Sequence, residues 1–376
     1  MEHYLDNSAT TRVCPEAAQA AMEAMTAVYG NPSSTHALGR EAKKLLDRSR
    51  RQAAEALGCA PGELVFTSCG SESDNWAILG GAEAMKRRGK HVISSLVEHD
   101  AVRKSLDELE SRGFEVTRLR PEKDGSVDPG AVLKALREDT VLVTLMLVNN
   151  ETGGVTDIAG VSRALKSAGS GALLHTDAVQ GFLKVPFSAK TLGADLISVS
   201  GHKIHGPKGI GGLYIRSGLR LKPFILGGGQ EEGRRAGTEA MPQIAAFGEA
   251  CRVGRAGMAE HTARMAGLKA AALERLRREI PELQFVQSGA PHILSVSLPG
   301  WRSEVLMNYL EAREIYVSKS SACKKGGRSH VLEAIGLDAR AIDGAIRIGL
   351  SRFTTQEDID ALCSGLKDAH DSLAHR

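Results

Sequence analysis

The stretch Val141-Leu142-Val143-Thr144-Leu145-Met146-Leu147-Val148 is an almost unbroken apolar run, and the polar segment Asn149-Asn150-Glu151-Thr152-Gly153 follows it directly. A strand of this kind is buried on both faces, as in the middle of a parallel sheet covered by helices. Ligands of such sheets collect at the carboxyl ends of the strands. The two segments therefore predict a central strand and, where it ends, a binding site.

Shorter apolar runs on both sides of this stretch alternate with helical patterns. We expect strands at 64–67, 91–94, 114–119, 173–176 and 196–199, and helices at 72–88, 100–113 (capped by Asp100) and 128–137. This repetition is typical of a mostly parallel sheet enclosed by helices. Beyond about residue 250 we expect helices at 260–278, 304–311 and from about 355, and strands at 293–298, 315–317 and 345–350. The chain is therefore predicted to be an α/β protein with a second, smaller α+β domain.

Composition excludes several classes of protein. Of the 376 residues, 42% are hydrophobic and 25% charged, and the net charge of +3 comes from dispersed basic residues, so we expect no nucleic-acid partner. Neither a membrane-spanning apolar run nor a signal peptide is present, which predicts a cytoplasmic protein without a membrane partner. The six cysteines are scattered without a CxxC pair, so we predict neither a metal site nor a disulfide framework.

The strongest functional signal is Ser200-Gly201-His202-Lys203-Ile204-His205-Gly206, directly after the expected strand at 196–199. A lysine flanked by glycines at the end of a buried strand is placed to form a Schiff base with an aldehyde cofactor. A single lysine of this kind is more often a surface residue in a turn. The cofactor interpretation therefore depends on which residues stand at the ends of the other strands.

Polar residues that suit pyridoxal phosphate (PLP) come directly after four of those strands. Asp177 can pair with a pyridinium nitrogen, although a helix cap would explain it equally well, and Gln180 can bond the ring hydroxyl. The segment Thr67-Ser68-Cys69-Gly70-Ser71 joins a strand to a helix start and can hold a phosphate. His99 can stack on the ring, or be a plain turn histidine, and Asn150 ends the central strand. Their common position after strands favours a cofactor site.

Motifs over nearly the whole chain point the same way. They are Tyr4-Leu5-Asp6-Asn7-Ser8-Ala9-Thr10-Thr11, Gly30-Asn31-Pro32-Ser33-Ser34, Glu72-Ser73-Asp74-Asn75, Gly201-His202-Lys203, Gly227-Gly228-Gly229-Gln230-Glu231, Gly237-Thr238 and Ser321-Ala322-Cys323. With these motifs the chain resembles the cysteine desulfurases of the class V aminotransferase group, which are fold-type-I PLP enzymes. The resemblance implies a large PLP-binding domain at 14–254 with a mostly parallel seven-stranded sheet, and a small domain formed by 1–13 and 255–376.

The resemblance also implies a role for each site residue. Lys203, His99 and Cys323 would be catalytic, and Asn150 and Arg347 would bind the carboxylate of L-cysteine. Arg347 could otherwise be a surface arginine on a strand, but its forked side chain suits a carboxylate. The cofactor would be held by residues around the pocket: Lys203, Asp177, Gln180, His99, Gly70, Ser71, Asn150, Ser200, His202 and, from the other subunit of a homodimer, Thr238.

The expected reaction converts L-cysteine to L-alanine and leaves a persulfide on Cys323, from which a protein acceptor takes the sulfur. Cys323 lies in a polar, basic stretch with Lys324, Lys325, Gly326, Gly327 and Arg328, which favours a mobile, partly ionised thiol. Only six residues separate Cys323 from His330. We therefore expect the acceptor to come close to the site, attracted by the basic residues.

Alternatives remain at this point. A selenocysteine lyase or another β-lyase would use the same residues, a class V transaminase would need no mobile thiol, and a silent scaffold would not need Lys203, Asp177 and Cys323. The destination of the sulfur is open among iron–sulfur cluster assembly, tRNA thiolation and thiamine synthesis.

Overall fold

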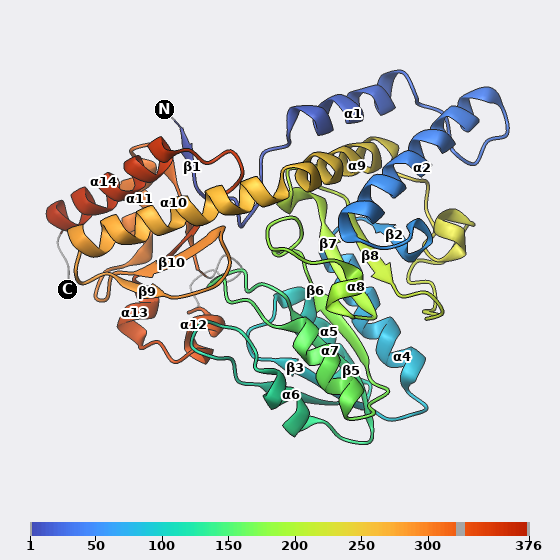
Figure 1. Ribbon diagram of the computed structural model, residues 1–376, viewed down its shortest axis with the longest axis horizontal. Coiled ribbons are helices and arrows are strands. Elements are labelled where there is room, and N and C mark those ends of the chain that lie inside the picture. The colour runs from blue at the N-terminus through green and yellow to red at the C-terminus, as the bar shows by residue number, and fades with distance from the viewer. Residues whose placement is uncertain (1, 321–327, 374–376) are drawn as a thin grey trace.

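The computed structural model describes residues 2–320 and 328–373. Its larger lobe is built on a seven-stranded sheet in the order β2-β8-β7-β6-β5-β3-β4 (Figure 1). All pairs of neighbours are parallel except those of β8, which runs against both β2 and β7. The strands are β2 Leu64–Thr67, β3 His91–Ser95, β4 Glu115–Leu119, β5 Thr140–Met146, β6 Leu173–Asp177, β7 Leu196–Ser200 and β8 Gly211–Ile215. The expected mostly parallel seven-stranded sheet is confirmed.

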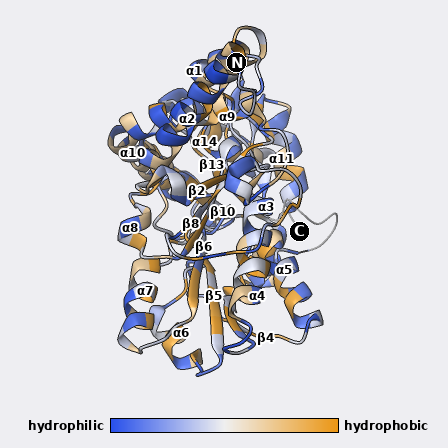
Figure 2. Cartoon of the chain, turned by 90° about the vertical axis from the view of Figure 1, so that its right-hand side faces the viewer, coloured by the Kyte–Doolittle hydropathy of each residue, from blue (hydrophilic) through white to orange (hydrophobic). Residues whose placement is uncertain are grey.

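Helices cover both faces of this sheet, as the buried β5 requires. On one face Ile78, Ala82, Val102 and Leu106 pack against Leu142, and on the other side a larger apolar cluster fills the space beneath the remaining helices. Figure 2 shows apolar residues concentrated on the strands, whereas the outer sides of the helices are polar. The helices are α1 Pro15–Thr26, α2 Ala37–Leu57, α3 Gly70–Asn75, α4 Gly81–Met85, α5 Asp100–Ser111, α6 Pro129–Ala135, α7 Ile158–Ser167, α8 Ala189–Leu192 and α9 Met241–Ala256.

Two details differ from the sequence-based expectation. The single helix expected at 72–88 is α3, a π-helical stretch Trp76–Gly80 and α4, with the buried indole of Trp76 lying against Gly80. Residue 100 does not cap α5, because the Nδ1 atom of His99 accepts the hydrogen bond from the Ala101 N–H at 3.2 Å. In addition, α1, α2, α7, α8, α9 and β8 of this lobe were not among the expected elements.

The smaller lobe contains a four-stranded antiparallel sheet in the order β12-β13-β10-β9. Helix α10 runs from the end of α9 in the large lobe across the small one (Figure 1). A second apolar core, separate from that of the large lobe, lies between this sheet and its helices. The elements are β9 Gln284–Val286, β10 Ile293–Ser297, β11 Ile315–Tyr316, β12 Ser318–Lys319, β13 Ala345–Gly349, α10 Met258–Glu279, α11 Ser303–Glu311, α12 His330–Ala334, α13 Ala339–Asp343 and α14 Gln356–Ser372.

The first residues of the chain pass between the two lobes. Strand β1 (His3–Tyr4) pairs with β11 of the small lobe, and Asp6 bridges to Gly349 at the end of β13. Further along, Thr11 donates from Oγ1 to the carbonyl of His202 in the large lobe, at 2.9 Å. This arrangement is compatible with the domain limits expected at residues 13 and 254, which stay a prediction. None of the helices in the described part of the chain is long and apolar enough to cross a membrane.

Gly349 should be required for this passage. A Cβ atom there would lie 2.5 Å from the Ser8 nitrogen and 3.0 Å from the Asn7 nitrogen, both backbone atoms that cannot rotate away. Gly349→Ala is therefore expected to lower the free energy of unfolding in urea by roughly 1–3 kcal/mol.

Gly267→Ala is the matched control. It lies inside α10, where a Cβ meets nothing within 4 Å, so alanine should stabilise the protein by up to about 1 kcal/mol. Equal unfolding curves for the two variants would show that the N-terminal segment adapts to the extra methyl group.

Candidate functional site

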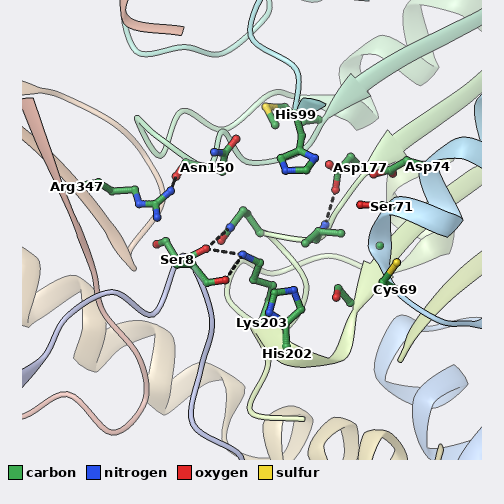
Figure 3. Close-up of a pocket in the computed structure, with 16 residues that line it drawn as sticks. Ser8, Cys69, Ser71, Asp74, His99, Asn150, Asp177, His202, Lys203 and Arg347 are labelled. Carbon is green, nitrogen blue, oxygen red and sulfur yellow. Dashed lines mark hydrogen bonds between the residues drawn. The ribbon is translucent and has the colours of Figure 1, made fainter. Parts of the chain in front are cut away.

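A pocket of about 290 Å³ lies where the strands of the large sheet end and the N-terminal segment crosses them (Figure 3). Five segments that come after β2, β3, β5, β6 and β7 all contribute to its wall, and β13 adds one residue from the small lobe. Ten of the residues expected in the site line this pocket: Gly70, Ser71, His99, Asn150, Asp177, Gln180, Ser200, His202, Lys203 and Arg347.

Lys203 is held at the floor of the pocket by the N-terminal segment. It ends the short 3₁₀ turn Gly201–Lys203 that comes after β7. Its Nζ atom donates to the carbonyl oxygens of Ser8 at 2.6 Å and Ala9 at 2.7 Å. Gly201 fits this turn because a Cβ would lie 2.7 Å from the Ile210 side chain. Nearby backbone carbonyls therefore solvate the ammonium in place of water.

Asp177 is the last residue of β6 and lies across the pocket from Lys203 (Figure 3). Its Oδ1 atom accepts a hydrogen bond from the Val179 N–H at 2.9 Å. Burial raises the pKa of the Asp177 carboxyl, and the charges of His99 and Lys203 oppose that effect. Burial and the Asp177 charge likewise raise the pKa of Asp74, a second carboxyl in the wall. A cation in the pocket would therefore stabilise the ionised form of Asp177.

His99 projects over the same space from the start of α5. Its Nδ1 atom accepts the hydrogen bond from Ala101, and a backbone N–H can only donate. The Nδ1 atom is therefore unprotonated, and in the neutral ring the proton is on Nε2. The capping bond also orients the ring, which suits a group that stacks on a flat ligand.

The end of the pocket next to β2 and β7 can receive an anion. Gly70 lies close to the segment after β6, since a Cβ at this position would lie 2.8 Å from Cγ2 of Val179. The hydroxyl of Ser200 is buried without a hydrogen-bond partner among the described residues. Burial, with smaller effects of Lys203 and other cations, lowers the pKa of His202 to about 4, so its ring is neutral at physiological pH. Hydroxyl and ring donors are therefore available there.

Arg347 enters the pocket from β13 and is only 3% exposed, which rules out the surface alternative. Its Nη1 atom donates to the carbonyl of Asn150 at 2.9 Å, and its Nη2 atom lies 3.2 Å from Oδ1 of Asp6. Its Nε atom is buried and has no hydrogen-bond partner in the described part of the chain. The guanidinium is thus fixed in orientation and keeps a donor free for a carboxylate.

These groups match the polar groups of PLP. Gln180 donates from Nε2 to the Ser8 carbonyl at 2.8 Å, which leaves its buried Oε1 as an acceptor that meets no donor in the described residues. That oxygen suits a ring hydroxyl, the Ser200 hydroxyl suits a phosphate, and the Asp177 carboxyl suits a ring nitrogen that carries a proton. The residues present therefore fit the cofactor.

One of the expected site residues lies elsewhere, and another falls outside the described residues. Thr238 is exposed and does not line the pocket of its own chain. Cys323, Lys324 and Lys325 lie outside the described residues. Arg328, expected to attract an acceptor, forms an exposed ion pair with Asp343 at 2.9 Å.

The pocket also contains residues to which sequence reasoning assigned no role of their own: Ser8, Ala9, Cys69, Asp74, Met146 and Val179. Ser8 and Ala9 act through backbone carbonyls, which leave no mark in a sequence, although both belong to a motif that the resemblance includes. Among residues 2–320 and 328–373, no group of three histidine, cysteine or acidic side chains could hold a metal ion.

Comparisons with known proteins agree with this geometry. Residues 3–362 match the family model of the class-V aminotransferases. The cysteine desulfurase IscS of Methanosarcina thermophila is 41% identical over 364 residues, covering 95% of this chain and 89% of the relative. A solved NifS-like protein superposes with a TM-score of 0.93 at 36% identity, over 99% of this chain and 100% of its own. SspA in complex with cysteine gives 0.79 at 32% identity, over 94% and 100%.

Family model, sequence relatives and solved structures thus cover the same nearly full length of the chain, with its pocket inside the shared region. The chain therefore belongs to the class-V aminotransferase family, and within it to the cysteine desulfurases, whose chemistry depends on PLP.

Proposed function

We propose that this protein is a PLP-dependent cysteine desulfurase, which converts L-cysteine to L-alanine and holds the sulfur as a persulfide on Cys323. The observation that carries the proposal is the meeting of Lys203, Asp177 and Arg347 in one pocket. A lysine, a carboxylate and an arginine there serve an aldehyde, a ring nitrogen and an amino-acid carboxylate. The relatives named cysteine desulfurase, and the SspA complex with cysteine, support the substrate.

The cofactor would be held at three points. Lys203 would bind its aldehyde carbon, Asp177 its ring nitrogen, and Ser71, Ser200 and His202 with the backbone at Gly70 its phosphate. His99 would stack on the ring, whereas Gln180 would accept the hydrogen bond of the ring hydroxyl. When bound, PLP withdraws electrons from the amino-acid carbon as a proton leaves it.

The chain's own residues would carry out the remaining steps. Arg347 and Asn150 would bind the substrate carboxylate and so fix the position of its Cα and sulfur atoms. The Nζ atom of Lys203, once it is released from the aldehyde carbon of the cofactor, would take the Cα proton. The Cys323 thiolate would attack the substrate sulfur: an S–S bond forms, the C–S bond breaks, and the carbon that loses sulfur gains a proton to become the methyl group of alanine. Lys203 would return a proton to Cα.

The residues on either side of Cys323 support this role. Ser318 of β12 pairs with Arg347 itself across the small sheet. On the other side of Cys323, the Ser329 hydroxyl donates to the buried carboxylate of Glu151 at 2.5 Å, and Glu151 is next to Asn150 in the chain. Both flanks of the Cys323 segment are therefore attached to neighbours of the proposed substrate site.

We further propose a cytoplasmic homodimer that passes its sulfur to a protein acceptor. Apolar side chains between β8 and Thr238 are exposed in the single chain, including Phe224 at 41% and Leu226 at 82%. Clusters of exposed apolar residues commonly mark subunit interfaces. Thr238 comes after this stretch and would reach the phosphate of the other subunit.

Lys203→Ala should reduce alanine formation from L-cysteine by at least about 100-fold, because no other residue would take the Cα proton. Alanine release and the visible absorption of the purified protein would be measured together. Lys190→Ala, at an exposed position in α8, should behave as the wild type. Near-normal turnover in Lys203→Ala would refute the proposed active site.

Cys323→Ser should retain the cofactor and its spectral response to cysteine but form no persulfide. Mass spectrometry after thiol labelling would locate the sulfur. Cys69→Ser is the matched control, because Cys69 also lines the pocket and should leave the persulfide on Cys323 intact. A persulfide lost in Cys69→Ser and kept in Cys323→Ser would assign the nucleophile to Cys69.

The contribution of Thr238 across subunits can be tested by mixing two variants. Thr238→Ala alone should bind PLP more weakly, and Lys203→Ala alone should be inactive. A purified heterodimer of these two chains should contain one fully native site, since one subunit's Lys203 would meet the other subunit's Thr238. Its single active site should then bind PLP as the wild type does. Weak binding in the heterodimer, or an active monomer in sedimentation, would contradict the proposal.

A further inference from the structure

Lys184 is a buried lysine that the proposed reaction does not use. It lies after β6, in the turn beneath the pocket, and is 6% exposed. Its Nζ atom has no hydrogen-bond partner among the described residues. Burial, together with the charges of Lys203 and Arg347, lowers the pKa of Lys184 to about 7. An ammonium without acceptors in such surroundings is costly, so the protein must neutralise it or supply a counter-ion.

Arg352 is a second buried cation that lacks an acceptor, and unlike Lys184 it cannot become neutral by losing a proton. It lies just beyond β13, is 9% exposed, and its Nη2 atom is buried without a hydrogen-bond partner in the described part of the chain. Its guanidinium lies over the ring of Phe353, 5.1 Å from the centre. A ring face provides modest attraction but accepts no strong hydrogen bond. Because a guanidinium remains charged at every physiological pH, it requires an acceptor.

The two cations line the same small cavity. It lies behind Lys203, between the 3₁₀ turn after β7 and the start of α10, and has a volume of about 20 Å³. None of its lining residues in the described chain is acidic: they are Leu183, Lys184, Lys203, Ile204, His205, Gly254, His261, Met265, Ser351 and Arg352. Such a volume is small, and it suits a monatomic ion better than phosphate, sulfate or a carboxylate.

The remaining titratable groups of the wall do not provide the missing negative charge. Burial lowers the pKa of His205 to about 3, and its Nδ1 atom is hydrogen-bonded to the Arg12 carbonyl at 2.8 Å. Burial and Arg352 lower the pKa of His261, which therefore tends to be neutral. Lys203 is engaged with the carbonyls of Ser8 and Ala9. The wall therefore carries positive charge alone.

We propose that this cavity is a binding site for a small monovalent anion of chloride size, held between the Lys184 ammonium and the Arg352 guanidinium. The ion would accept hydrogen bonds from both side chains and offset their charge. It would be separate from the substrate pocket, because Lys203 stands between the two spaces and lines both. The inference rests on these buried cations and does not depend on the proposed desulfuration.

Bromide is the probe for a direct test. Crystals of the full chain with its cofactor, grown without chloride, would be soaked in sodium bromide and measured at the bromine absorption edge. We expect an anomalous peak in contact with Lys184 Nζ and the Arg352 guanidinium, and no such peak in Lys184→Met crystals. A site that contains only water while bromide binds elsewhere in the same crystal would overturn the proposal.

Thermal unfolding tests whether chloride bound at this site stabilises the folded protein. Relative to sodium acetate at equal ionic strength, chloride should raise the wild-type melting temperature by roughly 2–4 °C, because it binds the folded state alone. Lys184→Met should lose this chloride-specific rise, yet melt no lower than the wild type in acetate, since it removes an uncompensated buried charge. Arg352→Met provides a second variant if the first does not fold.

Lys190→Met is the matched control, an exposed lysine that should keep the full chloride effect. If chloride raised the melting temperatures of Lys184→Met and Arg352→Met as much as that of the wild type, the proposal would be overturned. A bromide peak accompanied by that result would be an adventitious ion only.

Discussion

The hydrogen bonds from the Lys203 ammonium to the carbonyls of Ser8 and Ala9 hold three parts of the molecule at one point. Lys203 belongs to the large sheet through β7. Ser8 and Ala9 belong to the N-terminal segment, which pairs with the small lobe through β1 and the bridge from Asp6 to Gly349. The pocket therefore exists only when the segment lies between the lobes. This explains why residues at the very start of the chain help to form a site whose other walls come after strands of the large sheet.

Burial of charged groups in the pocket is unfavourable, and the proposed cofactor would reduce this cost. Buried carboxyls and buried cations occur within one pocket wall, and desolvation moves the pKa of Asp177 up and that of His202 down. Desolvation favours the neutral form of each group. A ligand that carries both a protonated ring nitrogen and a phosphate would stabilise the ionised carboxyl of Asp177 at one end of the pocket. Its phosphate would accept hydrogen bonds from the hydroxyls at the other end. Perturbed groups of this kind typically mark functional sites.

Sequence reasoning located the elements whose patterns are strong and missed those whose patterns are hidden. β5 was evident because its sequence is an almost unbroken apolar run, and all seven of its residues are buried. β8 was missed because it starts with Gly211 and Gly212, and at Gly211 a Cβ would lie 2.7 Å from the Cys69 backbone. The buried side of α1 consists of alanines alone, so that no large apolar periodicity marks it.

The same distinction separates the site residues that the sequence revealed from those it did not. Side chains at the ends of strands, such as Asp177 and Asn150, were predictable because parallel strands bring their carboxyl ends together. Thr238, which the resemblance assigns to the site of the other subunit of a homodimer, does not line the pocket of its own chain, and that assignment stays a prediction. Contacts made by backbone atoms, such as the Ser8 carbonyl, leave no residue preference that a single sequence could display.

Arg347 shows how the two lobes would share the work in the proposed reaction. It comes from β13 of the small lobe, but its Nη1 bond goes to Asn150 of the large lobe and its Nη2 partner is Asp6 of the N-terminal segment. Since Arg347 is 3% exposed, its charge is hardly screened by water. A substrate carboxylate would thus meet a guanidinium whose Nε atom is available, whereas its Nη2 atom is already paired with Asp6. Binding of the amino acid would in this way act on contacts that join both lobes.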